Sequence, residues 1–210
     1  SDWNAEEIAA HRDRQRCAVL LRGRGLTPGG AVAAIADATG SARHVTVDAG
    51  AHMFPAMALI PAPVPARILI SNGLSTMGYA LPAAIGAALL APGEASIAIT
   101  GDAGLLMCLG ELRTAARERL HIVVIVFADG ELSLIRNKQD RRGLEPAGVR
   151  IGNMDWQQVA AGLGLRSFRA CDEATLRHTL ADALAGEGPA LIEARVDPSG
   201  YGAMLRTLRG

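Results

Sequence analysis

Two aspartates each follow a short apolar run, and together they suggest a site for a divalent metal and a phosphate group. Asp102 comes after residues 96–100 and one glycine, and Asp129 follows the run at residues 122–127. Both runs are rich in β-branched residues, as in parallel strands buried on both faces. The carboxyl ends of parallel strands meet at one sheet edge, where open α/β folds bind ligands. Because Mg²⁺ prefers oxygen ligands and usually keeps only one or two protein carboxylates, the pair is predicted to bind Mg²⁺ and a phosphorylated ligand.

The elements that must position these aspartates form an alternating series. Residues 105–120, between the two runs, have the length and pattern of a crossover helix. Helix and strand patterns alternate along the whole chain, which predicts a three-layer α/β/α sandwich with a central, mostly parallel sheet. Further strands are expected at residues 44–48, 67–70 and 190–196. Further helices are expected at residues 4–21, 28–38 (capped by Thr27), 82–91, 132–138, 155–163 and 173–185 (capped by Asp172), with a proline-rich surface connection at 61–65 and irregular chain at 143–153.

The segment Gly101-Asp102-Ala103-Gly104, with Ala128-Asp129 downstream, resembles the Gly-Asp-Gly and Asn-Asn signature of thiamine diphosphate enzymes. The chain is therefore similar to the diphosphate-binding (PP) domain of that family. The resemblance implies that Asp102, Asp129 and the main-chain oxygen of Glu131 bind Mg²⁺, and that Mg²⁺ holds the diphosphate of the cofactor. It also implies the thiamine diphosphate-binding fold.

Three positions depart from that signature. Ala103 stands at the third glycine, Ala128 at the first asparagine and Asp129 at the second. Aspartate can bind Mg²⁺ as asparagine does, and Ala103 is compatible with the loop if its φ stays negative. Ala128 removes a polar side chain that the signature normally contains.

Two further segments carry the same resemblance. Residues 72–86 resemble the segment that meets the middle of the cofactor, where a methionine, here Met77, wedges beneath the bent cofactor; a polarizable thioether suits that contact. The carbonyl of Ser75 and the N–H of Met77 would then bind the aminopyrimidine. Residues 46–52 resemble the loop whose backbone and histidine contact the diphosphate. The implied cofactor-binding residues are Gly50, His52, Ser75, Met77, Gly101, Asp102, Ala103, Gly104, Asp129 and Glu131.

The resemblance is greatest to the acetolactate synthase-like branch, which implies a lyase or transferase that decarboxylates a 2-oxo acid or joins it to a second carbonyl compound. The glutamate that activates the cofactor comes from a separate pyrimidine-binding domain in this family, so no catalytic residue is assigned in this chain. We therefore expect residues 1–22 to be a connecting helix and 23–210 to be the PP domain. The chain is expected to be inactive alone and to work in a homodimer or homotetramer. Ser133, Leu134 and Gln139 are expected to face the substrate.

Three alternatives remain open. The chain could be a stand-alone subunit of a two-chain 2-oxo acid decarboxylase. It could be a non-catalytic scaffold that keeps the fold, which the alanines at 103 and 128 favour. A nicotinamide-binding domain would need G-x-G-x-x-G opening a helix after the first strand. Gly23-Arg24-Gly25 lacks the third glycine and does not follow a clear strand.

Composition limits the remaining classes of function. The 210 residues are 50% hydrophobic and 3% aromatic, which predicts one large domain with a core of Ala, Val, Ile and Leu. Lys and Arg number 21, as do Asp and Glu, so the formal net charge is zero. This balance argues against nucleic-acid or anionic-membrane partners. The basic run at residues 136–142 is interpreted as a surface loop beside the metal loop.

The cysteines and the hydropathy pattern indicate the compartment. Cys17, Cys108 and Cys171 are odd in number and lack C-x-x-C spacing, which favours buried thiols in a reducing compartment. The apolar runs are shorter than the roughly 18 residues that suggest a membrane span. The protein is therefore expected to be soluble and cytoplasmic.

Overall fold

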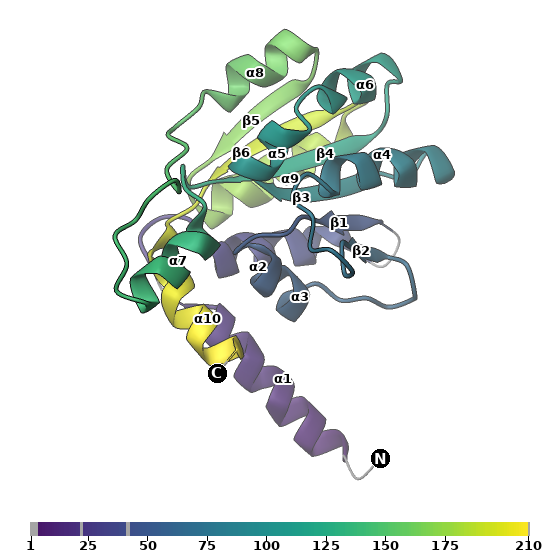
Figure 1. The fold of residues 1–210 in the computed structure, drawn as a ribbon. Coiled ribbons are helices and arrows are strands. Elements are labelled where there is room, and N and C mark those ends of the chain that lie inside the picture. Colours follow the sequence, from purple (N-terminus) through teal and green to yellow (C-terminus); the bar gives the residue numbers. More distant parts are fainter. Residues whose placement is uncertain (1–3, 22, 41–42, 210) are drawn as a thin grey trace.

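A single six-stranded sheet organises the chain, in the computed structural model that describes residues 4–21, 23–40 and 43–209 (Figure 1). The strand order is β2-β1-β3-β4-β6-β5, and every pairing is parallel. The strands are β1 (Val45–Val47), β2 (Ile68–Ile70), β3 (Ser96–Gly101), β4 (Ile122–Ala128), β5 (Arg166–Ala170) and β6 (Ala190–Arg195). The predicted three-layer α/β fold is therefore confirmed.

Helices cover both faces of this sheet. One face carries α2 (Pro28–Thr39), α3 (Met53–Leu59) and α9 (Glu173–Ala185), and the other carries α4 (Ala80–Leu90), α5 (Asp102–Met107), α6 (Glu111–Arg117) and α8 (Trp156–Leu163). The predicted caps are present, since the Thr27 hydroxyl accepts from the N–H of Gly30 at 3.0 Å and Asp172 accepts from the N–H of Thr175 at 2.8 Å. Each cap pairs an N–H that the first helical turn leaves free.

The central strands divide their side chains between two apolar cores. In β4, Val123 and Ile125 pack under α2 and α9, whereas Val124 and Val126 pack under α4 and α6. This alternation follows from the two-residue period of a strand. Because both faces are covered, β4 is apolar throughout, which is why its sequence shows no alternation.

The chain order places a topological switch point between β1 and β3. From β1 the chain passes outward to β2 and then returns to the other side of β1, where β3 and β4 follow. Parallel α/β sheets bind ligands in the crevice beyond the carboxyl ends of the strands at such a point. The loops after β1, β3 and β4 therefore lie where a ligand site is expected.

Several sequence predictions need correction. Strand β5 was not expected, because two of its five residues, Arg166 and Arg169, are charged, but as an edge strand it pairs with β6 alone. A single crossover helix was predicted at 105–120, but the structure has two short helices, α5 and α6, separated by Cys108–Gly110. Helices α3 and α10 (Tyr201–Arg209) were also not predicted, nor was the 3-10 turn η1 (Pro198–Gly200). The basic run, interpreted as a loop, lies mostly in helix α7 (Ser133–Arg141).

The first helix, α1 (Ala5–Val19), projects from the body beside α10 (Figure 1). Asn4 and Glu7 form a capping box at its start. Its side chains are mostly exposed, and Val19 is its one buried residue. The helix predicted at 4–21 is therefore present, but it buries little apolar surface against this chain. Residues 1–3 and 22 of the proposed connecting segment lie outside the described residues.

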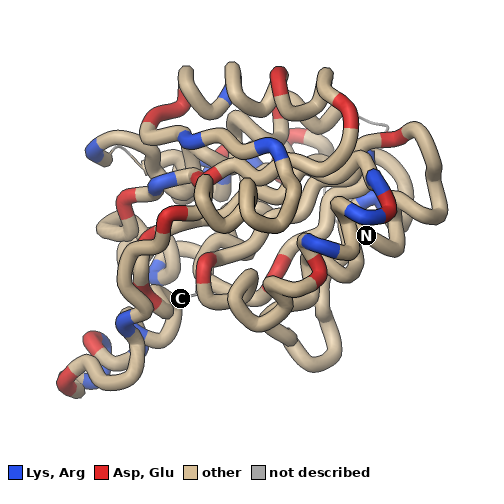
Figure 2. Tube along the Cα trace, turned by 90° about the horizontal axis from the view of Figure 1, so that it is seen from above, with Lys and Arg blue, Asp and Glu red and all other residues tan. Residues whose placement is uncertain are grey.

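The cysteines are more exposed than the sequence predicted. Cys17 and Cys171 are exposed and Cys108 is half-buried, so the prediction of buried thiols was wrong. Figure 2 shows basic and acidic residues interspersed along the chain. Within the described ranges, no helix is long and apolar enough to cross a membrane.

Candidate functional site

A pocket of about 350 Å³ opens at the carboxyl ends of β1, β3 and β4. The structure brings all ten sequence-predicted residues to its lining: Gly50, His52, Ser75, Met77, Gly101, Asp102, Ala103, Gly104, Asp129 and Glu131. Its remaining lining is largely apolar and includes Phe54, Phe127 and Leu132. Volume and lining match those of small-molecule sites, which are mostly apolar with a few convergent polar groups.

Asp102 begins α5 and is 4% exposed. Its Oδ2 accepts from the N–H of Gly130 at 2.7 Å, and its Oδ1 accepts from the N–H of Ala103 at 2.8 Å. Burial raises the pKa of Asp102, although these backbone hydrogen bonds act in the opposite direction. The bond to Gly130 ties the loop after β3 to the loop after β4, so the two aspartates occupy one site.

Asp129 follows β4 and faces the same pocket. Its Oδ2 accepts from the Ser133 hydroxyl at 2.6 Å, and its Oδ1 accepts from the N–H of Glu131 at 3.1 Å. Burial, together with the charge of Asp102, raises the pKa of Asp129 to about 6. Two neighbouring carboxylates that burial makes costly to ionise would be stabilised by a bound cation.

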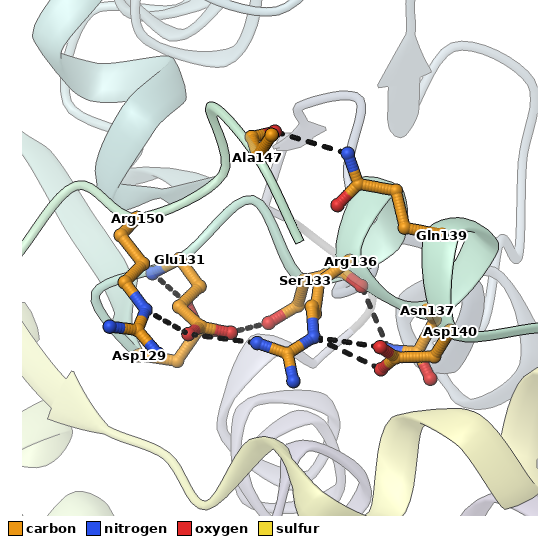
Figure 3. A network of polar contacts seen from close by, with 9 residues as sticks. All are labelled: Asp129, Glu131, Ser133, Arg136, Asn137, Gln139, Asp140, Ala147 and Arg150. Carbon is orange, nitrogen blue, oxygen red and sulfur yellow. Dashed lines mark hydrogen bonds and ion pairs between the residues drawn. The ribbon is translucent and has the colours of Figure 1, made fainter. Parts of the chain in front are cut away.

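The Glu131 carboxylate lies near two arginines, with Arg136 at 3.7 Å and Arg150 at 3.9 Å (Figure 3). This side chain therefore has cationic partners of its own, and the main-chain oxygen of Glu131 is the candidate ligand that the family signature implies. Across the described part of the chain, no three His, Cys, Asp or Glu side chains converge as a ready-made metal site. The donor set is thus two carboxylates and main-chain oxygen, a set that suits Mg²⁺ with water and phosphate ligands.

His52 contributes a buried polar atom without a partner. The residue is 5% exposed, its ring lies 5.6 Å from that of Phe127, and its Nε2 has no hydrogen-bond partner. Burial lowers the pKa of His52 to about 4, so the imidazole is neutral at pH 7. A Cβ at Gly50 would meet the His52 ring at 2.6 Å, which explains the glycine in this loop. An unpaired nitrogen beside the pocket fits a ligand that offers a hydrogen bond.

Of the departures from the family signature, Ala103 has a local explanation. Positive φ among the described non-glycine residues occurs at Ala66, Ser75 and Arg119, so Ala103 keeps a negative φ and tolerates its Cβ. Ala128 packs beside the core under α4 and α6 and does not line the pocket. The alanine at 103 therefore leaves the loop backbone intact.

Some residues differ from their predicted roles. Of the three residues expected to face the substrate, Ser133 and Leu134 line the pocket, whereas Gln139 does not and its amide donates to the Ala147 carbonyl at 3.0 Å (Figure 3). Lys138 and Tyr201 line the pocket and were not predicted. Tyr201 is 1% exposed, and its pKa is raised by burial and by the charges of Asp129 and Asp102. No local pattern marks either residue, because α7 and α10 reach the pocket only through packing.

Asp129→Asn should make the metal-free chain more stable above pH 6. The folded state raises the pKa of Asp129 from 3.8 to about 6, so ionisation lowers stability as pH rises through this window, by up to about 3 kcal/mol. Asparagine has no charge to bury, and its amide can still serve Ser133 and Glu131. Thermal unfolding in EDTA should show a gain of several degrees at pH 7, at about 2–4 °C per kcal/mol. The gain should vanish near pH 4.

A matched control for this prediction is Asp172→Asn. Asp172 is an exposed helix cap whose pKa is lowered by hydrogen bonds from Thr175. Its replacement should give no gain above pH 6. Equal melting temperatures for Asp129→Asn and the wild-type chain at pH 7 would contradict the charge penalty.

Comparison with known proteins was consistent with this site. Residues 48–194 match the family described as "Thiamine pyrophosphate enzyme, C-terminal TPP binding domain". The acetolactate synthase of Bacillus subtilis (strain 168) is 35% identical over 158 residues, which cover 74% of this chain and 28% of that protein. The catabolic acetolactate synthase of Raoultella terrigena is 33% identical over 199 residues, which cover 92% of this chain and 35% of that protein. The chain thus spans about a third of these relatives.

A solved structure shows the same fold. The Rhodococcus jostii RHA1 thiamine diphosphate-dependent 4-hydroxybenzoylformate decarboxylase superposes with a TM-score of 0.78 at 22% identity. The match covers 85% of this chain and 34% of that one.

Proposed function

This chain belongs to the thiamine pyrophosphate enzyme family, as a C-terminal TPP-binding domain, and we propose that it binds thiamine pyrophosphate, also called thiamine diphosphate, through Mg²⁺. We propose further that the complete enzyme acts on a 2-oxo acid, by decarboxylation or carboligation. The observation that carries the proposal is that three segments, around His52, Met77 and Asp102, meet Asp129 in one pocket.

The residues present fit the cofactor and its metal. Asp102 and Asp129 supply carboxylate oxygens whose ionised form needs a nearby cation, and the main chain of Glu131 supplies a third oxygen. His52 borders the same pocket, and the Nε2 of its neutral imidazole is available as a hydrogen-bond acceptor, for example for a metal-bound water. Diphosphate and Mg²⁺ together bring the charge and the hydrogen-bonding groups that this cluster lacks.

The apolar part of the lining suits the rings of the cofactor. Met77 reaches the pocket from the loop before α4, and its adaptable thioether can fill an irregular space between rings. The carbonyl of Ser75 and the N–H of Met77 are assigned to the aminopyrimidine. Ser133 and Leu134 on α7 are assigned to the substrate side.

When bound, thiamine diphosphate supplies an electron-accepting thiazolium ring, while the protein binds, orients and shields it. The acids of this pocket have other tasks, since Asp102 and Asp129 are assigned to the metal and Glu131 pairs with arginines. We therefore propose that the activating glutamate comes from a pyrimidine-binding domain of the same or a partner chain, with the site at a homodimer or homotetramer interface. Turnover of pyruvate by this chain alone, with cofactor and Mg²⁺, would contradict this part of the proposal.

The test is thermal stabilisation of the chain by thiamine diphosphate with Mg²⁺. A ligand that binds only the folded state stabilises it by about 2.7 kcal/mol at 100 times its Kd. We expect a melting-temperature rise of about 5–10 °C that needs both diphosphate and metal. Mg²⁺ alone and thiamine with Mg²⁺ are the matched controls, and both should give much smaller shifts.

Other outcomes would identify the alternatives. A shift produced by NAD would contradict the cofactor assignment. A non-catalytic scaffold is favoured by Ala128, which replaces a polar side chain of the signature. No shift with thiamine diphosphate, even after a pyrimidine-binding domain is supplied, would establish that alternative and overturn the proposed function.

A further inference from the structure

Asp48 is a buried carboxylate at the end of β1 that does not line the pocket. It is 0% exposed, and it makes no ion pair among the described residues. Three donors satisfy it instead. Its Oδ1 accepts from the N–H of Tyr79 at 2.8 Å, and its Oδ2 accepts from the N–H of Gly78 at 3.0 Å and from the Thr100 hydroxyl at 2.9 Å. A buried carboxylate needs such bonds because desolvation is otherwise costly.

These partners belong to the two segments that carry the assigned cofactor contacts. Gly78 and Tyr79 directly follow Met77, and Thr100 precedes Gly101 and Asp102. A third contact lies on α5, where a Cβ at Gly104 would stand 2.1 Å from Asp48 Oδ2. Asp48 therefore fills the space between the loop at residues 71–79, called the Met77 loop below, and the start of α5.

The Met77 loop has few other hydrogen bonds to the rest of the chain. Ser75 is held at a φ of 50°, a conformation that is unfavourable for a residue with a Cβ, and Leu74 is 89% exposed. The loop's own hydrogen bonds are local, such as Ser75 N–H to the Ser71 carbonyl at 2.9 Å. Local bonds shape the loop but do not fix its position relative to Asp102. The bonds to Asp48 do, because Asp48 directly follows β1 and its own N–H donates to the Ile99 carbonyl of β3 at 2.9 Å.

We propose that Asp48 is a positioning residue that sets the separation between Met77, at the ring end of the cofactor, and Asp102, at its diphosphate end. The inference rests on the proposed function for the identity of the ligand. It goes beyond that function by assigning the ring-end geometry to a carboxylate that contacts neither cofactor nor metal. It also gives a reason for glycine at position 104, since a larger residue would displace this carboxylate.

The test is Asp48→Asn, which keeps the size of the side chain but leaves one acceptor oxygen. Thr100 can reverse its role and accept from the new amide, but the N–H of either Gly78 or Tyr79 must then face an NH₂ group. In the ligand-free chain, hydrogen exchange at one or both of these amides should accelerate about tenfold or more. The amide of Gly130, bound to Asp102 at 2.7 Å, is the internal control and should keep its rate.

Ligand binding is the second readout. With Mg²⁺ present, the affinity of Asp48→Asn for thiamine diphosphate should fall about tenfold. Its affinity for inorganic pyrophosphate, which reaches only the Asp102 and Asp129 end, should stay within about twofold of the wild-type value. A purely structural role would weaken both ligands in parallel.

Thr39→Val is the control for lost stability. Thr39 is 2% exposed at the end of α2, ahead of β1, and its hydroxyl donates to the Ile35 carbonyl at 2.6 Å. Its replacement should leave the ratio of the two affinities unchanged. Equal losses for both ligands in Asp48→Asn, or unchanged exchange at Gly78 and Tyr79, would overturn the inference. If the wild-type chain bound neither ligand while exchange still accelerated selectively, the proposed function would fail and the anchoring by Asp48 would stand.

Discussion

Asp102→Ala should abolish metal-dependent binding of thiamine diphosphate while the chain still folds. Asp102 is 4% exposed, lines the pocket and shares a buried negative site with Asp129, so its replacement removes one of the two assigned carboxylate ligands. Loss of a residue that merely supports a metal ligand costs about 10–100-fold in affinity, and loss of a direct ligand should cost more. Calorimetric titration of the chain with cofactor at fixed Mg²⁺ measures the effect, and circular dichroism verifies the fold.

A surface variant separates this result from a general effect of removing a carboxylate. Asp37→Ala removes an exposed aspartate that pairs with Arg177 on the outer layer of the molecule. Surface pairs of this kind contribute about 0–1 kcal/mol, so this variant should bind cofactor as the wild-type chain does. Retained Mg²⁺-dependent binding by Asp102→Ala would show that the cation lies elsewhere, and the proposed metal site would be wrong.

Gly104→Ala should destabilise the chain and disturb the same site. The added Cβ would lie 2.1 Å from Asp48 Oδ2 and 3.0 Å from Thr100 Oγ1. Asp48 cannot move away without breaking the three hydrogen bonds that hold it. Overpacking of this kind typically costs about 1–3 kcal/mol, which corresponds to a melting temperature lower by several degrees for a domain of this size. Thermal unfolding without ligand measures it.

Gly162→Ala is the matched control, because Gly162 also lies in a helix but has open space around its Cβ position. Alanine in a helix is favoured over glycine by about 0.5–1 kcal/mol, so this variant should be slightly more stable. The two substitutions therefore have opposite expected signs. A Gly104→Ala chain as stable as Gly162→Ala would contradict the close approach of Asp48 to α5.

The sequence predicted the parts of the fold whose signal is local. β4 is recognisable from its apolar, β-branched run, because a strand covered on both faces excludes polar side chains. Thr27 and Asp172 are recognisable as caps because an N-cap acts on an N–H three residues ahead. β5 carries no such signal, because a charged residue such as Arg166 does not mark a buried strand. Only the fold brings its guanidinium to the carbonyls near the end of α9. The break between α5 and α6 is equally hidden, because Gly110 alone does not end a helix.

The residues of the candidate site likewise fall into those that the sequence predicts and those that only the structure identifies. The sequence by itself determined which oxygen-bearing residues follow the buried strands, Asp102 and Asp129, because strand patterns and the residues that end them are encoded within a few positions. Only the tertiary structure decided that Asp48 binds the N–H of Gly78, 30 residues away, and the Thr100 hydroxyl, 52 residues away. It also decided that Tyr201 closes the same pocket. Burial and hydrogen bonding between distant segments depend on how the layers pack, and no spacing along the chain carries that information.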